Sequence, residues 1–269
     1  MDNSYRVGYS RKLWHEVKRF AARWPVGARH VCCLCGDRVQ RFLPYREGLA
    51  GMPAVVTMAD IIGSDVENFE CPACGCHDRE RHLFLYFKAV GLLESMRGAR
   101  VLHFAPESRL RHLIAAAGPA AYVRADLHPR QVGVQAMDLT AIDCPADNLD
   151  FVIANHVLEH VDDDAKALRE IFRVLKPGGR AVLQTPFSAL RPGAVEDPRI
   201  ESARARLEAY GQEDHCRLYG RNFAEHVMSF GFISHVGTHG SLLPNVDAHI
   251  SGVNAREPFL LFAKPEAGS

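Results

Sequence analysis

Six of the chain's eight cysteines lie between residues 32 and 76. Four of them form two CxxC pairs, Cys32/Cys35 and Cys71/Cys74, and a glycine follows each pair, as a tight turn favours. Tetrahedral zinc takes four thiolates, and one CxxC turn presents two of them to one ion. In a reducing compartment such pairs are metal ligands more often than disulfides. The spacing therefore predicts a structural zinc site on these four cysteines, with no coordination position left open for catalysis.

The neighbouring residues leave the ligand set open. Cys33, Cys76 and His77 could each replace one of the four cysteines. The thiols could also be buried without a metal, and Cys32 and Cys33 could carry out redox chemistry. The zinc site is the favoured interpretation because both CxxC pairs have the sequence context of a metal-binding turn.

A second group of reactive side chains lies between residues 214 and 219, where Asp214, His215, Arg217 and Tyr219 gather titratable and aromatic groups. A histidine with a pKa near neutrality could deprotonate a hydroxyl or amine nucleophile, and Asp214 or another acid could orient it. Arg217 and Tyr219 could contact the molecule that is modified. Alternatively, His215 could only hold this segment to a sheet, without a catalytic role.

The composition limits the possible partners. Basic and acidic residues number 32 each in a chain of 269 residues that is 47% hydrophobic. This balance gives no general electrostatic reason to bind nucleic acid, although a local basic surface is compatible with it. No apolar run of 18 residues occurs, and the first residues lack the apolar core of a signal peptide, so we expect a cytoplasmic protein without membrane contact.

The N-terminal part of the chain is predicted to be a small module. Apolar residues at helical spacing follow Ser10 and predict a helix that ends at Trp24-Pro25. Residues 26–76 are rich in loops. These residues contain too few apolar side chains to form a stable core without a metal ion. We therefore expect a zinc-ribbon-like module. A helix that begins at Asp78 would connect it to the main domain. We therefore predict a division into residues 1–90 and residues 91–269.

From Arg100 the pattern changes to alternating strands and helices. Strands are predicted at residues 100–105, 121–127, 132–136, 148–154 and 180–185. Helices are predicted at 106–117, where Pro106 suits a first helical position, and from the aspartates at 162–164 to the KPGG turn at 176–179. This alternation predicts a doubly wound α/β sheet that binds ligands at the carboxyl ends of its strands.

This region contains two motifs, NHVLEHV at 155–161 and RVLKPGG at 173–179. The motifs and their order are similar to those of a known family. Through them, residues 101–265 resemble the class I S-adenosylmethionine-dependent methyltransferases, in particular the methyltransferase type 11-like branch. The resemblance implies a Rossmann-like sheet of seven strands with a final antiparallel hairpin formed by residues 232–238 and 259–264. It also implies S-adenosyl-L-methionine as the cofactor.

The resemblance assigns the turn after the first strand to the methionine part of the cofactor. The residues of this turn are Phe104, Ala105, Pro106 and Glu107. The family's usual turn contains glycines, whereas this chain has none between Arg100 and Ala117, which we interpret as a subfamily variant. Glu107 is also explained by a helix start, where the helix dipole favours a carboxylate.

The resemblance also assigns the adenosine part of the cofactor. Asp126, followed by Leu127, corresponds to the acid that accepts from the two ribose hydroxyls, and a carboxylate can take two donors at once. Asp138 corresponds to the acid that accepts from the adenine amine, and Leu139 to the apolar side chain that packs on the ring.

Asn155 and His156 correspond to positions beside the sulfonium and the incoming acceptor. Since the sulfonium is already an activated methyl donor, catalysis needs mainly in-line positioning, with a base only where the acceptor must lose a proton. His215, His156 and Asp214 are the candidate catalytic residues.

Residues 188–222 are too long for a plain strand-to-helix connection and contain a predicted helix at 199–210. We interpret them as a lid that recognises the acceptor. The expected function is methyl transfer to a hydroxyl or amine of a small molecule, sugar-like or a natural product. The alternative is that the zinc module delivers an RNA or protein substrate, or acts as an adaptor without catalysis.

Overall fold

The computed structural model describes residues 16–23 and 27–268. The chain forms two compact units whose segments interleave along the sequence. Unit 1 comprises Met1–Gly51, Ser64–Leu85 and Asn245–Asn254, and unit 2 comprises Met52–Gly63, Tyr86–Pro244 and Ala255–Ser269. The domain boundary near residue 90 stays a prediction. Residues 16–22 are helical, whereas the expected cap Ser10 and stop Trp24-Pro25 lie outside the described residues.

Unit 1 consists of short elements around the cysteines. β1 (His30–Val31) pairs with β2 (Arg38–Val39) in an antiparallel ladder. The unit also contains β3 (Arg46–Leu49) and, much later in the sequence, α10 (Ala248–Ser251). The ring of His30 contacts the main-chain oxygen of His249 at 2.8 Å, which ties α10 to β1. The buried core of this unit is small and contains thiols among its apolar side chains: Cys32, Val39, Phe42, Cys71 and Cys76.

Arg81 is the largest fully buried side chain among the described residues of unit 1. It lies in the first half of α3 (Asp78–Ala89), and its guanidinium donates to the main-chain oxygens of Asn68, Phe69, Cys76, Ser251 and Gly252. The guanidinium carbon also lies 3.9 Å from the centre of the Phe42 ring. Arg81 therefore joins the loop at 68–69, the cysteine turn and the 245–254 segment.

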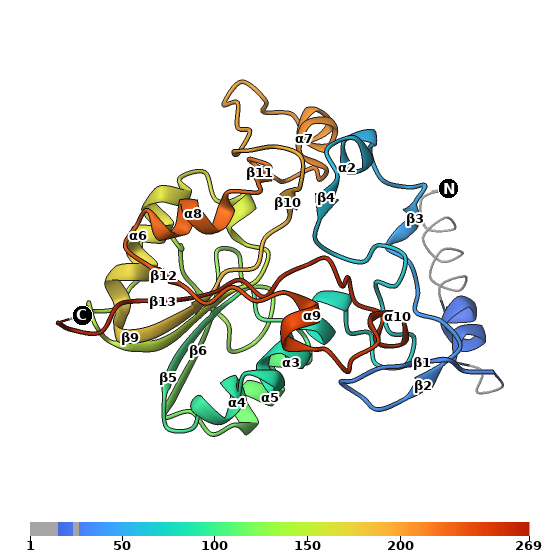
Figure 1. Ribbon diagram of the computed structural model, residues 1–269, viewed down its shortest axis with the longest axis horizontal. Coiled ribbons are helices and arrows are strands. Elements are labelled where there is room, and N and C mark those ends of the chain that lie inside the picture. Colours follow the sequence, from blue (N-terminus) through green and yellow to red (C-terminus); the bar gives the residue numbers. More distant parts are fainter. Residues whose placement is uncertain (1–15, 24–26, 269) are drawn as a thin grey trace, which may run out of the picture. The chain divides into compact units, whose positions relative to one another are not determined.

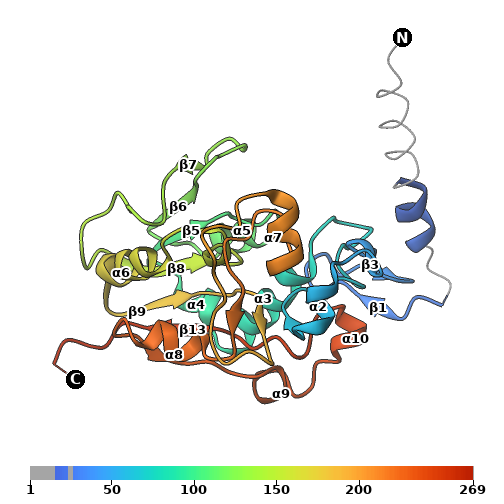
Figure 2. The same ribbon diagram turned by 90° about the horizontal axis from the view of Figure 1, so that it is seen from above.

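Unit 2 is built on the seven-stranded sheet that the sequence predicts. Its order is β12-β13-β9-β8-β5-β6-β7, with β13 antiparallel to both neighbours and the remaining pairs parallel. Figure 2 shows β7 near one edge of this sheet and β13 near the other. The strands are β5 (Arg100–Phe104), β6 (Ala121–Asp126), β7 (Gln135–Ala136), β8 (Leu149–Ala154), β9 (Leu175–Val182), β12 (Ile233–Ser234) and β13 (Leu261–Ala263).

Helices cover both faces of this sheet, as a doubly wound fold requires (Figure 1). On one face lie α6 (Asp164–Val174) and α8 (Phe223–Met228), and on the other lie α4 (Leu92–Ser95) and α5 (Leu110–Ala116). The side chain of Asp163 caps α6 by accepting from the Lys166 amide at 2.8 Å. Ala167, Leu168, Ile171 and Val174 then form the fully buried stripe that the helical period predicts.

Several predicted boundaries are wrong for local reasons. The helix expected at 106–117 begins at Leu110, because the chain turns sharply at Ala105 and residues 106–109 continue that turn. The helix expected from Asp78 ends at Ala89, and Gly91, with a φ of 64°, separates α3 from α4. Lys176-Pro177-Gly178-Gly179 lies inside β9 next to a register shift, so α6 ends earlier, at Val174.

Unit 2 also contains a small second sheet that the sequence did not predict. Its strands β4 (Ile61–Ile62), β10 (Phe187–Ser188) and β11 (Tyr219–Gly220) come from segments far apart in the chain. Beside it, α2 (Ala54–Met58) contacts α7 (Ala203–Tyr210) within the predicted lid. Residues 52–63 therefore pack with the lid and not with the cysteines.

Two further elements lie in unit 2: the 3₁₀ turn η1 (Leu158–His160) and α9 (His239–Leu242). Within the described ranges, none of the helices has both the length and the apolar character needed to span a membrane.

Candidate cofactor and acceptor site

A cavity of about 580 Å³ opens at the carboxyl ends of β5, β6 and β8. This is the edge where a doubly wound sheet binds its ligands. Eight of the predicted site residues line the cavity: Phe104, Ala105, Asp126, Leu127, Asp138, Leu139, His156 and Asp214. The structure thus brings the predicted ribose, adenine and sulfonium positions together in one cavity.

Two strand ends at this edge have an unusual backbone. Ala105 follows β5 with a φ of 46°, and His156 follows β8 with a φ of 54°. Non-glycine residues rarely adopt this left-handed region, and such residues concentrate at functional sites. Main-chain hydrogen bonds fix both turns, from the Ala105 amide to the Ala125 oxygen and from the His156 amide to the Gln184 oxygen, each 2.8 Å long. Ala105 therefore makes the sharp turn that glycine would otherwise provide.

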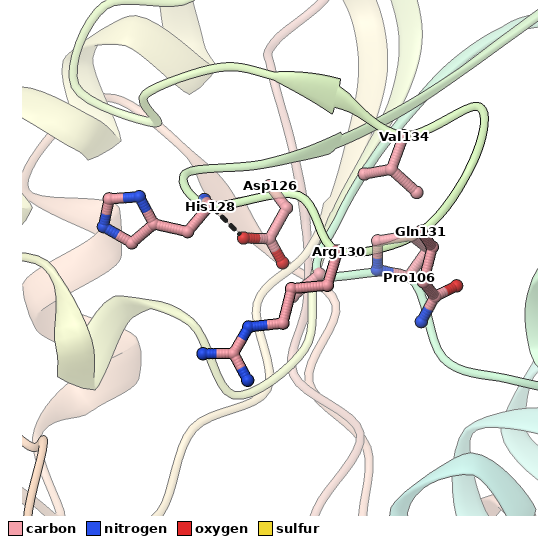
Figure 3. Close-up of a pocket in the computed structure, with 7 residues that line it drawn as sticks. Pro106, Asp126, His128, Arg130, Gln131 and Val134 are labelled. Atoms are coloured by element: carbon pink, nitrogen blue, oxygen red, sulfur yellow. Dashed lines mark hydrogen bonds between the residues drawn. The ribbon is translucent and has the colours of Figure 1, made fainter.

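Asp126 lies at the end of β6 and lines a second cavity, of about 400 Å³, as well as the first. One carboxylate oxygen accepts from the His128 amide at 2.8 Å. Figure 3 shows the Asp126 carboxylate with the side chains of Pro106, Arg130 and Gln131 around this second cavity. Arg130 and Gln131 are lining residues that no sequence motif had marked.

Asp138 and Leu139 lie beside β7 on the wall of the larger cavity. An oxygen of Asp138 accepts from the Thr140 amide at 2.8 Å, so its carboxylate is held in a turn. Leu139 is 4% exposed and belongs to the core of the sheet. The pair is placed as an acid next to an apolar surface, which is the arrangement expected for an adenine ring.

Asn155 is buried, Glu107 is partly buried, and neither lines either cavity. The Asn155 amide donates to Glu107, whose other carboxylate oxygen lies 2.9 Å from Nε2 of His103. Burial raises the pKa of Glu107, but the charge of His103 and the hydrogen bonds from His103 and Asn155 bring it below its usual range. These residues brace the ends of β5 and β8 against each other, and direct contact with the cofactor stays a prediction for them.

His156 lies between two buried carboxylates. Its Nδ1 is 3.2 Å from Glu159 and its Nε2 is 3.3 Å from Glu257. Burial raises the pKa of Glu159, but the hydrogen bond from His156 and the charges of the nearby histidine rings outweigh this effect. The net result is a pKa of about 2. Glu159 is therefore ionised across the physiological range, and it fixes the ring of His156 at the cavity wall.

His215 is buried, and burial lowers its pKa to about 4. Its ring packs edge-on against His160 with 4.7 Å between ring centres. The carboxylate of Asp214 contacts Nδ1 of His160 at 3.4 Å and the Gln212 amide at 2.9 Å. His160, which was not among the predicted site residues, lines the cavity with Asp214.

Arg217 and Tyr219 are almost fully buried and line neither cavity. Arg217 donates to the main-chain oxygens of Leu158, Val161 and Asp162, so it holds the segment that follows β8. The Tyr219 hydroxyl donates to Asp164 at 2.8 Å. Through these contacts Arg217 and Tyr219 hold the segment after β8 and the start of α6 in place. Their contact with the acceptor stays a prediction.

Asp164 is expected to stabilise the fold in a pH-dependent way. Burial raises its pKa, but the hydrogen bonds from His226 and Tyr219 and the charge of Arg217 lower it from 3.8 to about 2. A lowered pKa in the folded state stabilises the protein above the unfolded pKa, and this contribution is lost as the pH falls through about 2. Asp164→Asn should therefore cost about 2 kcal/mol at neutral pH.

Urea unfolding of the wild type and of Asp164→Asn between pH 7 and pH 3 measures this effect, with Glu201→Gln on an exposed side chain as the control. The difference between wild type and Asp164→Asn should shrink below about pH 4. A difference that stays constant down to pH 3 would show that the carboxylate charge is not the cause.

The cysteines of unit 1 form a second candidate site. One sulfur atom from each of Cys32, Cys35, Cys71 and Cys74 lies within 4.8 Å of the others. The Cys32–Cys74 and Cys35–Cys71 sulfur distances are 3.9 Å and 4.0 Å. Zinc–sulfur bonds of about 2.3 Å at tetrahedral angles separate the sulfurs by about 3.8 Å, so these four side chains fit a zinc ion.

The two CxxC turns have matching backbones. The Gly36 amide donates to the Cys32 oxygen and the Gly75 amide donates to the Cys71 oxygen, each at 2.8 Å. Both glycines have positive φ angles, 78° and 75°, which explains why glycine follows each pair. Cys76 remains a competing ligand because its sulfur lies 3.4 Å from that of Cys32.

The sheet order and the cavity at its carboxyl edge define a doubly wound, Rossmann-like fold. Residues 99–183 match a family described as a methyltransferase domain, which covers β5 to the end of β9. The chain therefore contains a methyltransferase domain over this region. No curated protein matches this sequence.

Solved structures with a similar fold have low sequence identity. A chain from a complex between the Haloferax volcanii Trm112 methyltransferase activator and a methyltransferase is 14% identical, with a TM-score of 0.45, over 70% of this chain and 93% of that one. A Mesorhizobium loti S-adenosylmethionine-dependent methyltransferase is 16% identical, with a TM-score of 0.44, over 66% and 96%. The Burkholderia thailandensis 1,6-didemethyltoxoflavin-N1-methyltransferase is 16% identical, with a TM-score of 0.42, over 68% and 79%.

Proposed function

We propose that this methyltransferase transfers the methyl group of S-adenosylmethionine to a hydroxyl or amine of a small-molecule acceptor. The observation that carries the proposal is one cavity with Asp126 and Asp138 on its wall together with His156, His160 and Asp214. Its volume of about 580 Å³ lies in the range of small-molecule sites. Such a cavity suits a cofactor and a compact acceptor better than a folded macromolecule.

Some residues of the cavity would bind the cofactor, and others would position the acceptor. Asp126 would accept from the ribose hydroxyls, Asp138 from the adenine amine, and the turn at Ala105 would let the backbone approach the methionine part. The cofactor supplies an activated methyl group, so the protein's main task is to align the acceptor with it. His156, fixed by Glu159 and Glu257, would face the reacting atoms.

His215 is a weak candidate base despite its place beside the cavity. Its pKa of about 4 keeps it neutral at physiological pH but gives it little driving force to take a proton. A neutral amine acceptor needs no base before it attacks. A hydroxyl acceptor would need another source of activation.

We also propose that Cys32, Cys35, Cys71 and Cys74 hold a structural zinc ion, which their sulfur distances support. With four protein ligands the ion would have no open position and would serve stability alone. The second candidate function, delivery of an RNA or protein substrate by this module, is favoured only by the presence of such a module. The cytoplasmic location stays a prediction.

Incubation with methyl-tritiated S-adenosylmethionine and a cell extract tests the proposed function. After incubation the small molecules, RNA and protein are separated and counted. Label in the small-molecule fraction supports the proposal, and label in RNA or protein supports delivery by the zinc module. Binding of S-adenosylhomocysteine without label in any fraction would indicate an adaptor.

A further inference from the structure

A cluster of three potential metal ligands reaches the wall of the large cavity through one of its members, His160, while the other two are buried. One ligand atom each from Glu159, His160 and His215 lies within 4.8 Å of the other two. Glu159 and His160 belong to the turn η1, which begins four residues after the end of β8, and His215 comes from the predicted lid 55 residues after His160. Such a convergence of two imidazoles and one carboxylate is the ligand set that divalent transition metals use.

A second, independent observation points to a ligand at this position. His215 is 6% exposed, and its Nδ1 has no hydrogen-bond partner within the described residues. A buried polar atom without a partner costs about 1–3 kcal/mol, so its retention calls for an explanation. A metal ion bound to this nitrogen would remove the cost.

The surrounding groups orient the other two side chains. The Thr185 hydroxyl donates to Oε2 of Glu159 at 3.0 Å, and the main-chain oxygen of Asp214 lies 3.2 Å from Nδ1 of His160. An acceptor behind a histidine ligand fixes its ring and makes it a better ligand. At bond lengths of about 2.1 Å the ligand atoms would lie about 3.0–3.4 Å apart, so the separations between ligand atoms would have to shorten by up to about 1.4–1.8 Å to complete the site.

We propose that Glu159, His160 and His215 bind one divalent transition-metal ion that presents an oxygen of the acceptor to the cofactor. The second half of this proposal rests on the proposed function. Three protein ligands leave coordination positions open, and His160 and Asp214 on the cavity wall place those positions beside the acceptor. The favoured acceptor is therefore a hydroxyl compound.

Metal binding would supply the activation that His215 alone lacks. A hydroxyl bound to a divalent ion has a lowered pKa and loses its proton to water. The oxygen then forms a bond to the methyl carbon, and the carbon–sulfur bond breaks. Its electron pair returns to sulfur, so the sulfonium becomes the neutral thioether of S-adenosylhomocysteine.

Manganese is the probe that separates this site from the cysteines. Thiolates prefer zinc and other soft ions, whereas imidazole and carboxylate groups accept Mn²⁺. Titration of the zinc-loaded full chain with Mn²⁺, followed by electron paramagnetic resonance, should show one bound ion per chain. His215→Ala and Glu159→Gln should weaken this binding by at least about 10-fold, while His112→Ala on the exposed part of α5 leaves it unchanged.

Two results would overturn the proposal: no Mn²⁺ binding to the wild type up to about 1 mM, or equal binding by wild type and both variants. A thermal melt of each variant shows that it is folded, and His215→Gln provides a second test if His215→Ala is not. Calorimetry with S-adenosylhomocysteine on the same samples keeps the two proposals apart. A wild type that does not bind S-adenosylhomocysteine would contradict the proposed function. A wild type that binds S-adenosylhomocysteine but not Mn²⁺ would contradict only the metal site.

Discussion

Replacing Arg81 with methionine is expected to lower the free energy of unfolding of unit 1 by about 3–5 kcal/mol. The guanidinium is fully buried and donates to five main-chain oxygens from three segments. Methionine fills a similar volume but leaves those oxygens buried without donors. Unit 1 has a small core, so a loss of this size would unfold most of it.

Arg81→Lys should restore only part of the stability. An ammonium group has three donors on one nitrogen and cannot reproduce the planar fork of arginine or its stacking on Phe42. Arg79→Met, on the same helix but partly exposed, is the matched control and should change stability by less than about 0.5 kcal/mol. Hydrogen exchange measures the effect at amides of unit 1, such as Cys71, which donates to Cys76. Unchanged protection in Arg81→Met would contradict this role.

Cys71→Ser is expected to release zinc and to unfold the cysteine turns. Metal binding by a small module is coupled to its folding and contributes on the order of 10 kcal/mol. The Cys71 sulfur lies 4.0 Å from that of Cys35, so its loss opens one corner of the predicted tetrahedron. Elemental analysis should find about one zinc per chain in the wild type and much less in the variant.

Two further substitutions show whether the effect is specific to the four ligands. Cys144→Ser, in unit 2, should retain zinc, because this thiol lies outside the cluster. Cys76→Ser should also retain zinc if Cys74 is the fourth ligand. Zinc loss in Cys76→Ser with retention in Cys74→Ser would move the fourth position to Cys76, and a wild type without zinc would end the metal interpretation.

The main sheet could be predicted from the sequence because its strands are long and apolar. β5, β6 and β8 each have five or six residues, and the stripe on α6 repeats at the helical period. The assignment of Asp126, at the end of β6, and Asp138, after β7, came from the resemblance to a methyltransferase sheet, and their contacts with the cofactor stay predictions. Motifs, periodicity and position agree at these sites.

The parts that were not predicted depend on contacts between distant segments. The strands β4, β10 and β11 have two residues each, too few to show a period, and they pair only because the lid folds back. Arg81 looks like a surface arginine until the 245–254 segment supplies carbonyl partners. Likewise, the metal-binding potential of Glu159 and His160 is invisible without His215, which is far away in sequence.

The positive φ at Ala105 could not be foreseen either. Nothing in the residue type of alanine favours the left-handed region. Its conformation follows from the hydrogen bond to Ala125 on the adjacent strand and from the proline that follows it. The missing glycine was visible in the sequence, but the residue that replaces it was visible only in the structure.

Calorimetric titration with S-adenosylhomocysteine tests the central claim, that the cavity at β5, β6 and β8 holds the cofactor. The wild type should bind one equivalent per chain. Asp126→Ala should weaken binding by about 10- to 100-fold, because a charged hydrogen bond contributes about 1.5–3 kcal/mol. Asp143→Ala, exposed and away from the cavity, should bind like the wild type. No binding by the wild type at about 1 mM ligand, or equal binding by Asp126→Ala, would contradict the account.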